Sequence, residues 1–120
     1  MIKLTFCLVR LPHLTREAFQ AYWLETHAPL VASVKDVLRI RRYVQTHSLP
    51  SAVSEGIRAS RQATAEFDGV AELWWDSFET MAPAGDAAAA EAGRMLLEDE
   101  RKFIDLPKSP LWWGQEHQIV

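Results

Sequence analysis

Residues 2–31 read IKLTFCLVRLPHLTREAFQAYWLETHAPLV and contain the clearest structural signals of the chain. Residues 2–11 are mostly β-branched or large apolar side chains and are ended by Pro12, a pattern that predicts a strand. Thr15 then offers a hydroxyl suited to cap a helix, and apolar residues recur at roughly helical spacing over 16–34. The sequence therefore opens with a predicted strand followed by a predicted helix.

Pro29 interrupts this helix. Proline lacks a backbone N–H and crowds the preceding turn, so we expect a kink or break near His27. The same criteria predict strands over 38–47, 67–75 and 111–120, a short helix that ends near residue 81, and a helix over 87–103. Residues 48–64 lack strong periodicity, and we expect a long excursion there with a short helix near 55–61, which is a candidate lid.

The order of predicted elements is β, α, β, long loop, β, α, β. Two βαβ units of this length form an α+β, ferredoxin-like βαββαβ sandwich, with helices on one side of a four-stranded sheet. The other face would carry Trp74 and further large side chains, a patch too apolar for most monomers to expose. We therefore expect residues 1–120 to form one domain that pairs as a homodimer, with a small-molecule pocket in the barrel between the paired sheets.

Composition and charge exclude several classes of protein. Hydrophobic residues make up 48% of the chain and charged residues 24%, the balance of a globular domain rather than a disordered one. The net charge of −3 argues against nucleic acid as the main partner, because that role needs a clustered basic surface. No stretch is long and apolar enough to span a bilayer, and the lone Cys7 fits a reducing compartment. We expect a soluble, cytoplasmic protein without membrane contact.

Motifs for the commonest cofactors are absent. The glycines are scattered rather than grouped in a phosphate-binding loop, and there is neither a GxSxG elbow nor an HExxH pair. The histidines are far apart, so a metal site would have to be assembled in three dimensions, for example from His47, Glu72 and His117. We expect no cofactor and no resident metal.

Several segments together resemble the EthD-like family of the dimeric alpha–beta barrel superfamily. They are IKLTFCLVRLPHLTREAFQAYWLETHAPLV (2–31), RRYVQTH (41–47), FDGVAELWWDS (67–77) and DERKFIDLPKSPLWW (99–113), with EH at 116–117. The resemblance leaves out only 50–65 and implies a ferredoxin-like fold, a homodimer with a barrel between subunits, and no tightly bound cofactor. Members of the superfamily include cofactor-free monooxygenases, isomerases, cyclases and dehydratases, so the resemblance predicts the fold better than the reaction.

The resemblance also implies individual site positions. The recurrent family motifs fall on Trp23, His27 and Pro29 (W…HxP), on Tyr43, Gln45 and His47 (YxQxH), on Asp68, Gly69, Glu72 and Trp74 (DGxxExW), and on Phe103, Ile104 and Asp105 (FID). We expect the substrate to contact His27, Gln45, Asp68, Trp74 and His117. Structural alternatives stay open: a hydrogen bond at the helix kink for His27, a turn for Asp68, and dimer packing for Trp74.

Tyr43, His47 and Glu72 are the predicted catalytic residues. Tyr43 and His47 are four residues apart in one strand, so they point to the same sheet face about 13 Å apart. A carboxylate within an apolar barrel has its pKa raised, and a histidine there can titrate near neutrality. Such a set suits proton abstraction beside a carbonyl, with Tyr43 donating to the developing oxyanion. The alternative of equal weight is an internal hydrogen-bond network that satisfies a buried Glu72.

The leading hypothesis is a cofactor-independent enzyme of lyase, isomerase or monooxygenase type. It would act by acid–base chemistry on an aromatic, lactone or polyketide-like small molecule. The alternative is a non-catalytic small-molecule-binding accessory protein of a degradation pathway, which would need the pocket but no titratable pair. A haem- or metal-binding barrel is the third hypothesis.

Overall fold

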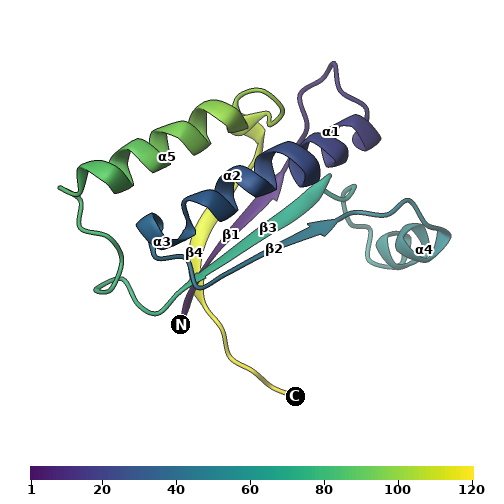
Figure 1. Ribbon diagram of the computed structural model, residues 1–120. Helices are drawn as coiled ribbons and strands as arrows, with labels where there is room; N and C mark the ends of the chain where they lie inside the picture. The colour runs from purple at the N-terminus through teal and green to yellow at the C-terminus, as the bar shows by residue number, and fades with distance from the viewer.

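One antiparallel sheet forms the centre of the computed structural model, which describes residues 1–120 (Figure 1). Its strands are β1 (Ile2–Leu8), β2 (Arg42–His47), β3 (Gly69–Trp75) and β4 (Leu111–Gln115). They lie in the order β2-β3-β1-β4, so each βαβ crossover leaves room for one strand between the two that it joins. This topology confirms the predicted α+β, ferredoxin-like fold of the dimeric alpha–beta barrel type.

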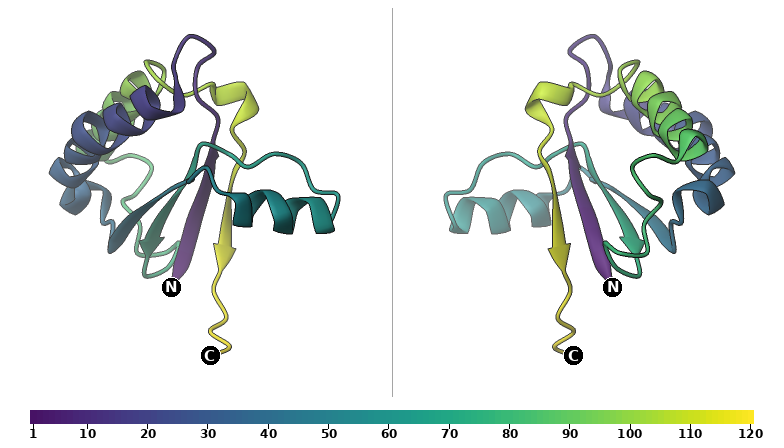
Figure 2. Two further views of the ribbon diagram at one scale, coloured as in Figure 1. Left: turned by 90° about the vertical axis from the view of Figure 1, so that its right-hand side faces the viewer. Right: turned by 90° about the vertical axis from the view of Figure 1, so that its left-hand side faces the viewer.

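The main helices cover one face of the sheet and leave the other open (Figures 1 and 2). The helical elements are α1 (Arg16–Tyr22), the π-helix η1 (Trp23–His27), α2 (Ala28–Ser33), α3 (Lys35–Leu38), α4 (Ala52–Ser60), α5 (Ala87–Glu100) and the 3-10 turn η2 (Leu106–Lys108). Both α1 and α5 begin as capping rules require. The side chains of Thr15 and Asp86 each accept a hydrogen bond from a backbone N–H of the first turn.

The strand register sorts side chains between the helix-covered face and the open face. Directly paired residues point the same way, and successive residues in a strand alternate. Tyr43, Leu73 and Leu4 are paired across β2, β3 and β1 and face the helices. The adjacent row, in which Val44 pairs with Glu72, faces the open side.

A core of large side chains joins the helices to one end of the sheet. Leu8, Phe19, Trp23 and Phe103 are buried almost completely. Burial of a side chain of this size contributes about 1.5–3 kcal/mol, so this end of the molecule holds the two layers together. Packing here is tight: a Cβ added to Gly69 would lie 2.3 Å from Cζ3 of Trp23.

The second strand is shorter than the sequence predicts. It begins at Arg42 rather than at residue 38, because Lys35–Leu38 forms α3 and Arg39 then adopts the left-handed conformation (φ 60°) that ends this helix. Leu38 and Ile40 still point inward, one from the helix and one from the loop after it. Two inward-facing apolar residues at positions 38 and 40 have the same spacing as one face of a strand, which is why the sequence predicts a strand there.

Other predicted elements differ at their ends. The strand predicted over 2–11 ends at Leu8, that over 67–75 begins at Gly69, that over 111–120 ends at Gln115, and the helix over 87–103 ends at Glu100. The short helix predicted to end near residue 81 is a series of turns. There, Ser77 and Thr80 accept hydrogen bonds from each other's backbone N–H, which competes with a helix.

The predicted break near His27 takes the form of a π-helix. The N–H of Ala28 donates to the carbonyl of Trp23, five residues back, in place of the usual four. In a regular α-helix the ring of Pro29 would crowd the carbonyl of Glu25, and the wide turn relieves this crowding. The helix then resumes as α2, with its direction set by η1.

Residues 48–66 form an excursion that projects from the sheet. Its helix α4 covers Ala52–Ser60 rather than 55–61 and is capped by Ser51, whose hydroxyl accepts from the N–H of Ser54 at 3.0 Å. Figure 2 shows α4 on the side of the sheet away from the other helices. None of these residues lines the cavity described below, so the segment is not a lid over it.

No helix in the structure combines the length and apolarity needed to cross a membrane.

Candidate functional site

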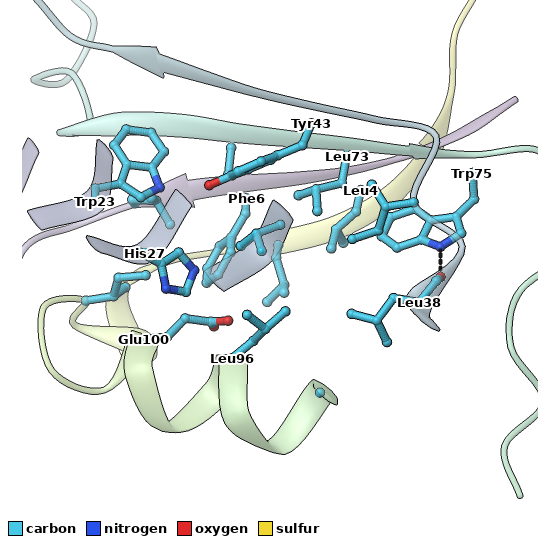
Figure 3. A pocket seen from close by; sticks show the side chains of 17 residues that line it. Leu4, Phe6, Trp23, His27, Leu38, Tyr43, Leu73, Trp75, Leu96 and Glu100 are labelled. Carbon is cyan, nitrogen blue, oxygen red and sulfur yellow. Dashed lines mark hydrogen bonds between the residues drawn. The ribbon is translucent and has the colours of Figure 1, made fainter. Parts of the chain in front are cut away.

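An apolar cavity of about 230 Å³ lies between the helices and the sheet (Figure 3). Strands β1, β2 and β3 form its floor, and η1, α2 and α5 form much of its roof. Of its 17 lining residues, 14 are hydrophobic. The sequence predicts a pocket between two paired sheets. The cavity described here is built by one chain and lies on the helix-covered face, whereas the predicted pocket would form on the open face with a second chain.

Polar side chains gather at one end of this cavity. Figure 3 shows His27, the hydroxyl of Tyr43 and the carboxyl of Glu100 converging at that end, while Leu38 and Trp75 occupy the other. The three polar side chains come from η1, β2 and α5, which are far apart in sequence. No lysine or arginine lines the cavity.

His27 is held by a buried carboxylate. Its Nδ1 lies 2.7 Å from Oδ2 of Asp99, and the Tyr22 hydroxyl donates to Oδ1 of Asp99 at 2.7 Å. Burial acts to raise the pKa of Asp99, but the hydrogen bonds from Tyr22 and His27 outweigh it and keep that pKa below its ordinary value. Because an ionised carboxylate only accepts hydrogen bonds, Nδ1 of His27 carries the proton.

The second ring nitrogen of His27 faces the cavity. Nε2 makes no hydrogen bond, yet no buried side-chain nitrogen or oxygen of the protein lacks a partner. Nε2 is therefore not enclosed by other atoms, and we infer that it borders the cavity that His27 lines. Burial lowers the pKa of His27 despite the opposing effect of Asp99, so the ring is neutral near pH 7. It presents an unprotonated nitrogen to an occupant of the cavity.

Glu100 is a carboxyl group in apolar surroundings. It lies on α5 one turn beyond Leu96, and both side chains line the cavity. Burial raises the pKa of Glu100 to about 7, and the charge of the adjacent Asp99 adds to this effect. Near neutral pH both protonation states are populated, so Glu100 can donate or accept a proton.

Tyr43 is oriented by a short chain of hydrogen bonds outside the cavity. Its hydroxyl accepts from Nε2 of Gln45 at 2.7 Å, and the same nitrogen donates to the carbonyl of Trp23. Oε1 of the same Gln45 amide lies 2.7 Å from Nε2 of His47, and the His47 ring stacks on Trp23. Burial raises the pKa of Tyr43, so its phenol keeps its proton and can donate to an oxygen in the cavity. Gln45 and His47 do not line the cavity.

The structure does not bring Glu72 together with Tyr43 and His47. Glu72 is on the open face, where Nζ of Lys3 donates to its carboxylate at 2.6 Å. Tyr43 and His47 are on the helix-covered face with Leu73, the next residue along β3 from Glu72. Since successive residues of a strand point to opposite faces, the three predicted catalytic side chains of one chain are separated by the sheet.

The other predicted contact residues also lie away from the cavity. Trp74 is on the open face, where the guanidinium of Arg42 lies 4.7 Å from its ring centre. Asp68 accepts a hydrogen bond from the backbone N–H of Arg10 at 2.8 Å, and its carboxylate also forms an ion pair with the Arg10 guanidinium. These contacts give Asp68 a structural role. His117 is exposed beyond β4. No group of three or more His, Cys, Asp or Glu side chains is placed to hold a metal, so the set of His47, Glu72 and His117 is not assembled.

The comparisons with known proteins agree with this architecture. The EthD domain model matches residues 11–107, which include every polar residue of the cavity. The chain belongs to the EthD domain family. A crystal structure of an EthD family protein from Bacillus halodurans C-125 is similar, with a TM-score of 0.65 and 23% identity, covering 98% of this chain and 99% of that one. No curated protein matches the chain.

Family membership makes this EthD domain a small-molecule-related protein of the dimeric alpha–beta barrel type. At 23% identity the solved structure shows only the fold. The chemistry of the site therefore rests on the side chains of this chain.

Two residues at the polar end of the EthD domain's cavity are not predicted from the sequence: Glu100, which lines the cavity, and Asp99, which holds His27. Asp99 and Glu100 are part of a charged run, DERK, that is typical of a solvated helix end. A signal was nevertheless present, because Leu96, Glu100 and Ile104 follow one another at steps of four. A carboxyl group on the apolar stripe of an amphipathic helix is a candidate buried acid.

Proposed function

We propose that this EthD domain, residues 1–120, binds a small molecule in its helix–sheet cavity and catalyses proton transfer on it without a cofactor. The observation that carries the proposal is the convergence of His27, Tyr43 and Glu100 on one end of an apolar cavity. These side chains supply a neutral imidazole, a protonated phenol and a carboxyl group of pKa about 7. Removal of a proton beside a carbonyl needs groups of these types.

Each residue has a defined role in the proposed step. Nε2 of His27 takes the proton from the carbon next to a substrate carbonyl, and the electron pair of that C–H bond moves toward the carbonyl oxygen. Tyr43 donates a hydrogen bond to this oxygen, and protonated Glu100 can supply a second hydrogen bond or the proton that completes an enol. Asp99 stabilises the imidazolium that forms and fixes the ring orientation, as a carboxylate behind a catalytic histidine does.

The lining of the cavity selects the class of substrate. It offers no lysine or arginine to pair with a carboxylate or phosphate, and the ionised Asp99 behind His27 adds negative charge beside the polar end. A neutral, mainly apolar molecule with one carbonyl or hydroxyl fits, which includes aromatic, lactone and polyketide-like compounds. An isomerase, a lyase and a cofactor-free monooxygenase can each begin with this deprotonation.

We further propose that the domain works as a homodimer formed through the open sheet face, in the cytoplasm. Trp112 on that face is 50% exposed in a single chain, and a second copy would cover it. The open face also carries the Lys3–Glu72 ion pair, which can meet the same pair of a partner.

The proposed cytoplasmic location is supported by Cys7. Its buried thiol has no disulfide partner, which fits a reducing compartment.

The proposed chemistry can be tested without knowledge of the substrate. Methyl ketones and β-diketones with alkyl tails are incubated in D₂O with the protein, and proton NMR follows deuterium uptake beside the carbonyl. We expect the wild type to accelerate this exchange, and His27→Asn to lower the rate at least about 100-fold, the usual contribution of a general base. His13→Asn, at an exposed position outside the cavity, is the matched control and should exchange like the wild type.

The same assay separates the competing readings. Glu72→Gln should leave the exchange rate unchanged, because Glu72 faces away from the cavity. His47→Gln should lower the rate modestly, because His47 reaches the cavity only indirectly, through Gln45 and Trp23. If the ketones bind to the wild type but do not exchange, the domain is a binding protein rather than an enzyme. Full activity in His27→Asn would refute the site assignment.

A further inference from the structure

A glycine in the middle of α5 has no conformational or packing explanation. Gly93 has no positive φ, and a Cβ added to it would meet no atom within 4 Å. A glycine inside a helix destabilises it relative to alanine, and α5 uses alanine at Ala87–Ala90 and Ala92. Neither the backbone nor a neighbouring element therefore requires glycine at this position.

Gly93 does border the cavity, at its opening. It lines the cavity and is also exposed to solvent, as is Leu111 of β4. Residues with both properties lie where the cavity meets solvent. A side chain at position 93 would therefore lie beside the mouth of the cavity, where an added Cβ meets no other atom within 4 Å.

The position of Gly93 along α5 gives the length of the cavity from its opening to its polar end. Gly93, Leu96 and Glu100 line the cavity from the same helix. Seven residues of helix rise about 10 Å, so the opening beside Gly93 is about 10 Å from the acidic group at the polar end. The walls between the two ends include Leu4, Leu73 and Leu96, all apolar.

We propose that Gly93 determines substrate specificity by leaving room for an apolar tail. The preferred ligand then has a neutral hydroxyl or carbonyl head at His27, Tyr43 and Glu100, and an alkyl or ring extension of about 10 Å that ends at the opening beside Gly93. This inference rests on the proposed function, because it takes the polar end of the cavity as the site of the head group.

The test uses 4-alkylphenols as probes, from ethyl to octyl, with binding measured by calorimetry. For the wild type we expect affinity to rise about threefold to fourfold for each added methylene, the value for burial of one CH₂ group, until the tail reaches the opening. Gly93→Trp should bind 4-ethylphenol like the wild type but bind 4-hexylphenol at least about tenfold more weakly. Leu97→Trp, on the outward side of the same helix, is the matched control and should not alter either affinity.

Gly93→Leu provides a second variant with a smaller obstruction, and thermal unfolding of each variant verifies that α5 is intact. The inference is overturned, with the proposed function left standing, if 4-ethylphenol binds but tail length has no effect in the wild type. It is also overturned if Gly93→Trp and Gly93→Leu bind 4-hexylphenol as the wild type does. Failure of every phenol to bind the wild type overturns the inference and the proposed site together.

Discussion

At the scale of single residues, the site depends on placing ionisable groups where water is scarce. His27 is oriented by Asp99, and Glu100 is left among apolar side chains. Burial acts on their pKa values in opposite directions, because it disfavours the charged form of each. A base that is neutral and an acid that is partly protonated then coexist near neutral pH, which is the requirement for proton transfer in both directions.

Glu100 should make the stability of the protein depend on pH. Its pKa is about 7 in the folded state against 4.5 for the exposed group, so between these values the folded state binds more protons than the unfolded state. Stability contributed by the protonated carboxyl is therefore lost as pH rises through this range. Glu100→Gln should be more stable than the wild type by about 1–3 kcal/mol near pH 8 and equal to it near pH 4, measured by urea unfolding.

The control for this experiment is Glu25→Gln, because Glu25 is exposed on η1. Its stability relative to the wild type should be the same at both pH values. An equal difference in stability between Glu100→Gln and the wild type at both pH values would show that Glu100 is not held in an apolar site.

At the scale of elements, the strand register and the π-helix determine which side chains meet. Most strands and both long helices are predictable, because caps, prolines and apolar spacing act locally. The face of each strand is harder to predict, because a shift of one residue exchanges the two sides. Glu72 and Leu73 differ by one position, and only the pairing of Leu73 with Tyr43 shows which of the two faces the helices. The partnership of His27 with Asp99 spans 72 residues, which no local pattern encodes.

The contact between η1 and β3 gives a prediction at this scale. A Cβ at Gly69 would lie 2.3 Å from Cζ3 of Trp23 and 2.8 Å from the carbonyl oxygen of Thr46. Gly69→Ala must therefore displace Trp23, and we expect a loss of about 1–3 kcal/mol in the free energy of unfolding. Gly114→Ala, where a Cβ meets nothing within 4 Å, should change it by less than about 0.5 kcal/mol. Equal effects of the two substitutions, measured by chemical denaturation, would contradict this packing.

At the scale of the whole molecule, the two faces of the sheet have different roles. The helix-covered face holds the cavity, and the open face carries the exposed Trp112 and the Lys3–Glu72 ion pair, which a second copy could cover. The sequence predicts one pocket and one interface on the same face. In the proposed dimer each chain would keep its own cavity on the helix-covered face, so substitutions at the two faces should alter the proposed catalysis and the proposed association independently.

Dimer formation through the open face is tested with Trp112→Glu. This substitution places a charge in the proposed interface, where loss of a buried tryptophan costs about 2 kcal/mol or more. Light scattering after size exclusion should give twice the chain mass of 13.6 kDa for the wild type and a mixture shifted toward the single chain for the variant. Leu97→Glu, on the outer side of α5, should remain dimeric. A wild type that is monomeric at micromolar concentration would rule out the dimer.

In the proposed binding mode, ligands lie between the helices and the sheet of one chain, with their polar head at His27. A crystal structure of the protein soaked with 4-hexylphenol tests it most directly. We expect one probe in each chain, with the phenol oxygen in hydrogen-bond contact with Nε2 of His27 and the hexyl tail directed toward Gly93. A probe bound between the sheets of two chains, or a helix–sheet cavity that stays empty at a saturating concentration, would contradict it.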